Sequence, residues 1–202
     1  LSKTCVNRAW PKQIKNRIRS VENTKKVTGA MQMISVVKLN RIEEKLFVLR
    51  KYALKFENLM YNLANLSQES LSEYFKEPNS ADIALCLITS DSGLCGMYNQ
   101  NVIRIAEEFL EKNSAKKVKL ILVGQKGLSY FRGKPQEILN AYTGINEKFT
   151  QNFCDKITRE LSQLFLGGKV GAVYLAYTYF KNPLVQKATL GRFLSIEPRL
   201  AK

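Results

Sequence analysis

The pattern that most constrains this chain is an unbroken heptad repeat in its first third. From residue 39 onward, large apolar residues recur at alternating steps of three and four: Leu39, Ile42, Leu46, Leu49, Ala53, Phe56, Met60 and Leu63. Apolar residues spaced 3.5 apart on average form the seam of a coiled coil. The pattern predicts one helix from about residue 12 to residue 66, roughly 80 Å long at 1.5 Å per residue.

This helix has no partner within the sequence, because no second heptad segment follows it. A rod far longer than a small domain is wide needs a second helix along its seam. We therefore expect the partner to be another chain, or a part of the protein outside this sequence. That expectation favours a mechanical or scaffolding role over a pocket enzyme.

The predicted rod also carries most of the positive charge. The chain has 32 Lys and Arg against 17 Asp and Glu, a formal net charge of +15, and the basic residues are dense in the first 60 positions. Such a helix seeks an acidic surface, which leaves nucleic acid, anionic lipid and an acidic protein sleeve open. Nucleic-acid recognition would set aromatic residues among the basic ones. Here the aromatic residues come late and partly on the seam, which favours a charged stripe that is solvated or faces a protein.

A second region, residues 79–202, alternates strand and helix after the turn cluster at residues 78–80. Strands are predicted at 83–89, 118–123, 170–180 and 184–196, and helices at 99–112, at 125–130 and at 145–166. This alternation is typical of a small α/β domain with a mostly parallel sheet. The prediction is thus a helical shaft at residues 1–78 and a Rossmann-like α/β domain at residues 79–202.

The glycine turn at residues 90–96 follows a predicted strand and precedes a helix. Loops in this position can cradle phosphate, and they can also be plain tight turns. No Gly-Lys-Ser/Thr follows, and the spacing of Gly93 and Gly96 does not fit the dinucleotide fingerprint. We therefore interpret Asp91, Gly93, Cys95 and Gly96 as a structural turn and expect no cofactor there.

Catalytic and metal-binding chemistry lacks the residues it needs. The sequence has no histidine, and its cysteines, Cys5, Cys86, Cys95 and Cys154, form no Cys-x-x-Cys pair. A zinc site of ordinary spacing is therefore excluded, and Cys95 has no histidine to activate it. Cys86 lies in an apolar run and is predicted to be a core residue. No stretch of 18 apolar residues predicts a membrane span.

Two motifs carry a resemblance to a known family. Residues 17–34 (RIRSVENTKKVTGAMQMI), followed by Val37-Lys38-Leu39, resemble the N-terminal signature of the γ subunit of F-type ATP synthase. Residues 90–99 (SDSGLCGMYN) resemble that family's second signature. The sequence departs from the family at Gly29, Ser92 and Met97, and it lacks the long C-terminal helix that pairs with the N-terminal one. That helix is the partner which the heptads require.

The resemblance implies a central-stalk rotor that couples proton-driven rotation of the membrane ring to ATP synthesis, with catalysis left to the β subunits. Its implied partners are the α and β subunits of the catalytic hexamer, ε/δ-type stalk subunits and the membrane c-ring. The residues implied to contact the β subunits are Lys25, Lys26, Met31, Gln32 and Ile34. The implied location is the matrix side of the mitochondrial inner membrane, or the cytoplasmic face of a bacterial membrane. A phosphate- or dinucleotide-binding α/β protein with a helical dimerisation arm remains the alternative.

Overall fold

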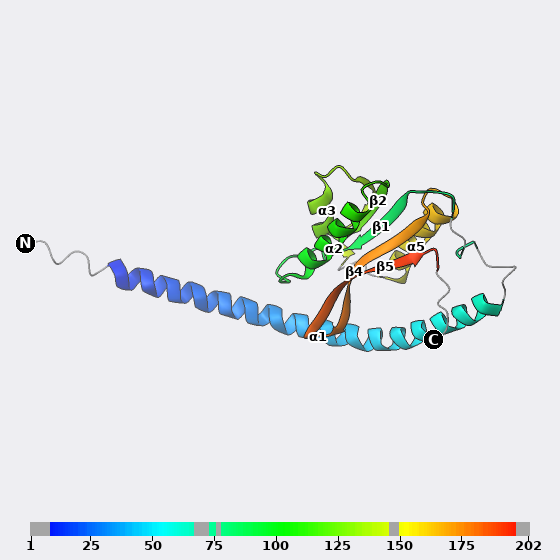
Figure 1. Ribbon diagram of the computed structural model, residues 1–202. Coiled ribbons are helices and arrows are strands. Elements are labelled where there is room, and N and C mark those ends of the chain that lie inside the picture. Colours follow the sequence, from blue (N-terminus) through cyan, green and yellow to red (C-terminus); the bar gives the residue numbers. More distant parts are fainter. Residues whose placement is uncertain (1–8, 67–72, 76–77, 146–149, 197–202) are drawn as a thin grey trace, which may run out of the picture. The chain divides into compact units, whose positions relative to one another are not determined.

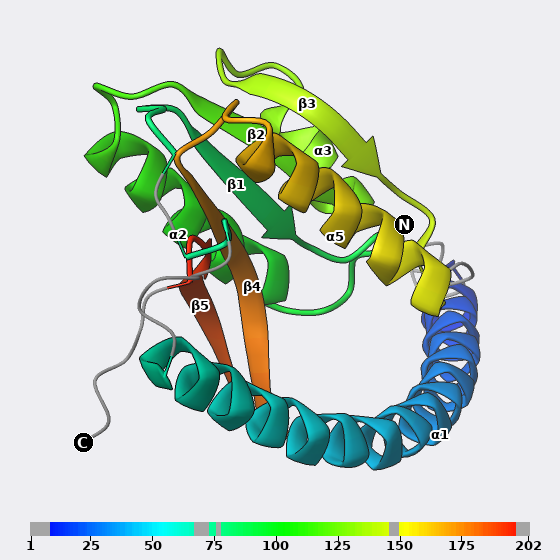
Figure 2. The same ribbon diagram turned by 90° about the vertical axis from the view of Figure 1, so that its right-hand side faces the viewer.

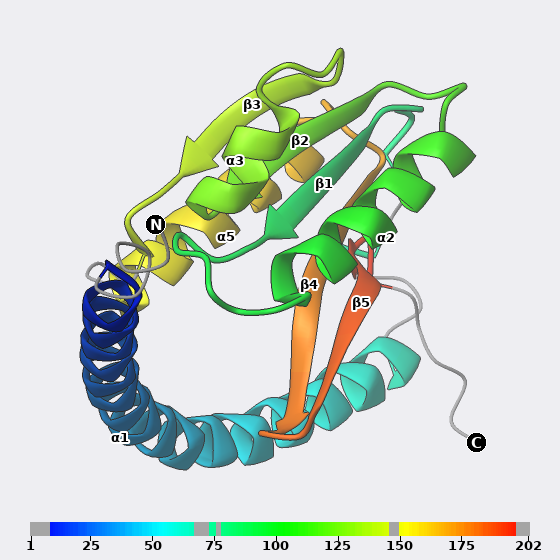
Figure 3. The same cartoon turned by 90° about the vertical axis from the view of Figure 1, so that its left-hand side faces the viewer.

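The long helix α1 spans Ala9–Leu66, 58 residues without a break. It belongs to the computed structural model of the chain, which describes residues 9–66, 73–75, 78–145 and 150–196. The side chains of α1 are described from residue 11 to residue 59. Figures 2 and 3 show that α1 curves along its length. The predicted rod is confirmed, and its bounds lie within three residues of those that the apolar pattern gave.

The chain divides into two compact units, Leu1–Asn62 and Leu63–Lys202. The division therefore falls inside α1, a few residues before its end. The split into a shaft at residues 1–78 and an α/β domain at residues 79–202, inferred from the turn cluster, stays a prediction.

The second unit is a five-stranded sheet with helices on both faces (Figure 1). In chain order its elements are β1 (Ile83–Ile88), α2 (Tyr98–Lys112), β2 (Val118–Val123), α3 (Gln125–Phe131), β3 (Glu137–Tyr142), α5 (Gln151–Leu166), β4 (Ala172–Asn182) and β5 (Val185–Leu194). The strands lie in the order β3-β2-β1-β4-β5. Only β5 runs antiparallel to its neighbour, so the predicted mostly parallel sheet is confirmed.

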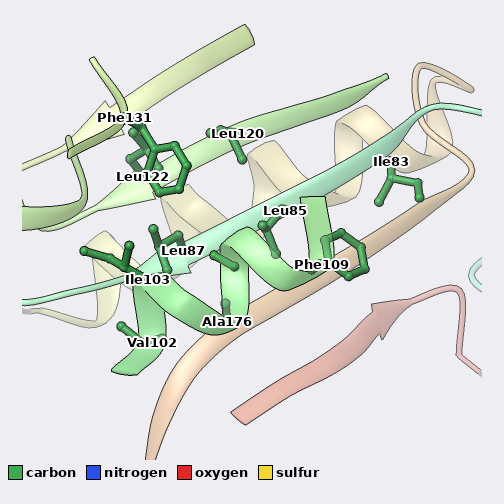
Figure 4. Packing of buried hydrophobic residues seen from close by; sticks show 11 residues of the cluster. Ile83, Leu85, Leu87, Val102, Ile103, Phe109, Leu120, Leu122, Phe131 and Ala176 are labelled. Atoms are coloured by element: carbon green, nitrogen blue, oxygen red, sulfur yellow. The ribbon is translucent and has the colours of Figure 1, made fainter. Parts of the chain in front are cut away.

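Alternating residues of the central strand β1 feed two separate cores. Ile83, Leu85 and Leu87 point to the face that α2 and α3 cover, where Phe109 and Phe131 join them (Figures 3 and 4). Ala84 and Cys86 point to the opposite face, which α5 covers (Figure 2). A strand buried on both faces reads as a continuous apolar run, which is why β1 could be predicted from the sequence.

Two predictions about this domain were wrong. The helix expected over residues 145–166 does not run unbroken, because Thr150 is extended (φ −129°, ψ 165°) and α5 begins at Gln151. The strand β3 was not predicted at all. It is an edge strand in which only Tyr142 is buried, so it lacks the apolar run that marks β1 and β2.

Candidate functional site

The first candidate site is the surface of α1. Among its described side chains, from residue 11 to residue 59, none is buried. On the predicted seam, Leu39 and Leu46 are partly exposed, whereas Ile42, Leu49 and Phe56 expose 60%, 62% and 51% of their surface. Ala53 is exposed as well, and the side chains of Met60 and Leu63 lie outside the described set. A helix with this much bare apolar surface requires a covering partner.

Apolar side chains also project from α1 on sides other than the seam. Phe47, Val48 and Leu54 lie away from the heptad seam, because successive residues of a helix are turned by about 100°. Each of the three is more than 60% exposed. Short-range contacts order some of the large side chains: Lys51 lies 4.2 Å from the Phe47 ring centroid, and Tyr52 stacks on Phe56. Apolar surface around a helix is typical of a helix enclosed on several sides.

The residues that the resemblance assigns to the β-subunit contact lie about one to four turns before the seam. Met31 and Ile34 expose 47% and 58% of their surface, and Lys25, Lys26 and Gln32 are exposed too. No other described part of the chain buries these five side chains. Their contact with the β subunits stays a prediction.

The second candidate site is the glycine turn after β1, whose polar groups form hydrogen bonds with one another. The buried Asn99 accepts a hydrogen bond from the Ser90 backbone N–H at 2.9 Å through Oδ1. Its amide nitrogen donates to the Ser90 hydroxyl at 2.8 Å and to the Cys95 Sγ at 3.1 Å. Leu94 and Gly96 take positive φ values of 59° and 56°. These internal bonds agree with the interpretation of a structural turn.

Asp91 connects this turn to the loops that follow β2 and β3. Its carboxylate accepts a hydrogen bond from the backbone N–H of Gln125 at 3.0 Å, and others from the N–H groups of Gly144 and Ile145. The three donors follow β2 and β3, so one side chain connects the carboxyl ends of three parallel strands. The turn position of Asp91 follows from the sequence, but these contacts do not, because they span 34 to 54 residues of sequence.

The thiols differ sharply in environment. Burial raises the pKa of the Cys86 thiol to about 12, and the negative charge of Glu160 adds to the shift. Cys95 is exposed on the turn. The prediction that Cys86 is a core residue is confirmed. No group of three or more His, Cys, Asp or Glu residues suited to a metal occurs within the described ranges.

Labelling with Ellman's reagent should separate these two cysteines. In a variant with Cys5 and Cys154 replaced by serine, we expect Cys95 to react promptly at pH 8 and Cys86 only after denaturation. A thiol with a pKa near 12 is ionised in about one molecule in ten thousand at that pH, and the thiolate is the reactive form. Two fast thiols in the folded protein would contradict the buried position of Cys86.

Comparison with known proteins identifies the family. The ATP synthase family model matches residues 11–201. The ATP synthase gamma chain of Anaeromyxobacter sp. (strain K) is 33% identical over 195 residues, which cover 94% of this chain and 67% of that protein. The chain belongs to the ATP synthase gamma-chain family. The gamma chain of Salinibacter ruber is 34% identical over 191 residues and is covered to 62% of its length. The chain thus spans about two thirds of these gamma chains.

A solved structure agrees with the family. The central stalk and c-ring structure of the Tetrahymena thermophila mitochondrial ATP synthase contains a chain that matches with a TM-score of 0.65 and 25% identity. The match covers 83% of this chain and 72% of that one. The gamma-chain relatives and the central-stalk neighbour together support a rotor subunit of the F-type ATP synthase. In the part of this gamma chain that the structure describes, no helix has the length and apolar character needed to cross a bilayer.

Proposed function

We propose that this gamma chain is the shaft of a rotary ATP synthase, with α1 enclosed by the α and β subunits of the catalytic hexamer. The observation that carries the proposal is α1 itself: a helix of 58 residues whose described side chains, 11–59, are all at least partly exposed. Its seam would pair with an antiparallel helix, and its other apolar sides would face the sleeve. Mobile Lys and Arg side chains hold any single acidic partner weakly, which suits a bearing that turns.

The α/β domain would sit at the foot of the shaft, on the membrane c-ring and beside ε/δ-type stalk subunits. Catalysis would belong to the β subunits, and this chain would be non-catalytic. Rotation of an asymmetric shaft would bias each β site in turn between conformations, which is coupling between distinct sites. This chain would be peripheral to the matrix side of the mitochondrial inner membrane. The cytoplasmic face of a bacterial membrane is the alternative, and the gamma chains named above from Anaeromyxobacter and Salinibacter are consistent with it.

The proposed contact with the β subunits rests on Lys25, Lys26, Met31, Gln32 and Ile34, which belong to the N-terminal signature. They combine exposed apolar surface at Met31 and Ile34 with two neighbouring cations. A surface of this kind can slide over a partner without a fixed hydrogen-bond pattern.

Replacing Met31 by lysine tests this contact in the assembled enzyme. An ammonium enclosed without a partner costs about 3 kcal/mol or more, and the cost falls on the moving interface. We expect ATP-driven proton pumping by membrane vesicles, measured per ATP hydrolysed, to fall roughly severalfold.

The matched control is Met33→Lys, which adds the same charge two residues away at a side chain that is 74% exposed. We expect this control to reduce coupling less than Met31→Lys. Equal coupling in the two variants and the wild type would reject the assignment of Met31.

A further inference from the structure

The carboxyl edge of the sheet contains a cradle of backbone N–H groups. Gln125 N–H and Gly144 N–H donate to Asp91 Oδ1 at 3.0 and 3.1 Å, and Ile145 N–H donates to Oδ2. Several backbone N–H groups that converge on one point form an anion-binding concavity. Hydrogen bonds from such donors to a charged carboxylate are stronger than those between neutral groups.

The cradle lies where sheets of this kind bind ligands. In open parallel α/β sheets, ligands bind beyond the carboxyl ends of the strands, and the donors here follow β2 and β3 directly. We propose that this edge is an oxyanion site which the chain fills with its own Asp91 carboxylate. The site takes up phosphate or a carboxylate from solution only when Asp91 is removed. The inference does not depend on the rotor role.

The loop that carries the Gln125 donor is held in place by contacts other than Asp91. Gly124 N–H donates to the Tyr142 carbonyl at 2.7 Å, and Lys126 N–H donates to the Ser90 carbonyl at 3.1 Å. The buried Thr89 hydroxyl accepts from Gly127 N–H at 2.9 Å and donates to the Val123 carbonyl at 3.1 Å. These bonds fix the loop after β2 on both sides of Gln125, so this donor stays in place when Asp91 is truncated.

The turn that carries Asp91 is anchored separately as well. Asn99 accepts from the Ser90 backbone N–H and donates to the Ser90 hydroxyl and the Cys95 Sγ, and the Tyr98 N–H donates to the Cys95 carbonyl at 3.3 Å. These contacts hold the turn locally without Asp91. The carboxylate is therefore positioned for the three N–H donors of the cradle, which lie 34 to 54 residues away in sequence.

The test is anion rescue of Asp91→Gly in the full-length chain. Thermal midpoints are measured against inorganic phosphate and against acetate, with chloride keeping the ionic strength constant, because a chain of charge +15 attracts every anion. We expect the variant to melt below the wild type in chloride alone. Its midpoint should then rise more steeply with phosphate concentration than the midpoint of the wild type, because only the variant has an open site that a ligand of the folded state can occupy.

The matched control is Asp82→Gly. Asp82 precedes β1, whereas Asp91 follows it, and the Asp82 carboxylate pairs with Lys119 at 3.0 Å. This variant loses an aspartate without opening the cradle. Its thermal midpoint should therefore rise with phosphate only as slightly as that of the wild type. If the thermal midpoints of Asp91→Gly and Asp82→Gly rise equally with phosphate, the proposal is overturned. If Asp91→Gly does not fold in chloride, Asp91→Ser is measured instead, and a response of that variant no steeper than the control's would equally overturn it.

Discussion

In the assembled ATP synthase, replacing both Leu46 and Leu49 by alanine should destabilise the complex by about 4 kcal/mol or more. Truncating a buried leucine costs about 2–5 kcal/mol, and neighbouring sites do not add exactly. Both residues lie on the heptad seam, which we expect to be buried against an antiparallel helix. The loss is measured from the urea or thermal midpoint of the assembled complex.

The same double substitution should cost little in this chain alone. There Leu49 is 62% exposed and Leu46 is only partly covered, so truncation removes little burial, and alanine favours the helix. Val48→Ala, on the opposite side of α1, is the control for the change in volume. Equal losses in the chain and in the complex would show that the seam has no partner.

Replacing Gly124 by valine should prevent the α/β domain from folding. Gly124 has φ 101° and ψ 142°, a region that only glycine adopts without strain. A Cβ there would lie 2.3 Å from the Thr89 carbonyl oxygen, which belongs to the backbone just after β1. Strain and overlap together exceed about 3 kcal/mol, a large share of a domain's stability.

Circular dichroism and the yield of soluble protein measure this effect. Gly133→Ala is the matched control, because a Cβ at Gly133 meets nothing within 4 Å and its φ is not in the left-handed region. The control should fold normally and melt within a few degrees of the wild type. A Gly124→Val variant that melts with the control would contradict the close approach of these two loops.

The sequence predicts the parts of this fold whose signal is local. The apolar run of β2 gives its bounds residue for residue, and β1 differs from its predicted range by one residue. Helix α5 was misjudged because Ile145, Phe149 and Phe153 keep helical spacing across a break at Thr150. Strand β3 escaped because its edge position leaves most of its side chains exposed, so periodicity does not reveal it.

The candidate sites also differ in how far the sequence predicts them. The seam and the signature residues of α1 follow from spacing and motif, and those whose side chains are described are exposed or partly exposed. The cradle around Asp91 could not be predicted, because its donors at Gln125, Gly144 and Ile145 are backbone groups that carry no sequence signal. Only the packing of three strand ends brings them together.

The most direct test of the rotor account is to watch the chain turn. The complete gamma subunit, with Cys95 as its single cysteine, is assembled with its α and β partners and carries a bead on that exposed thiol. With the hexamer fixed to glass, we expect ATP to drive the bead continuously in one direction. A bead that stays still on complexes that hydrolyse ATP at the full rate would contradict the account.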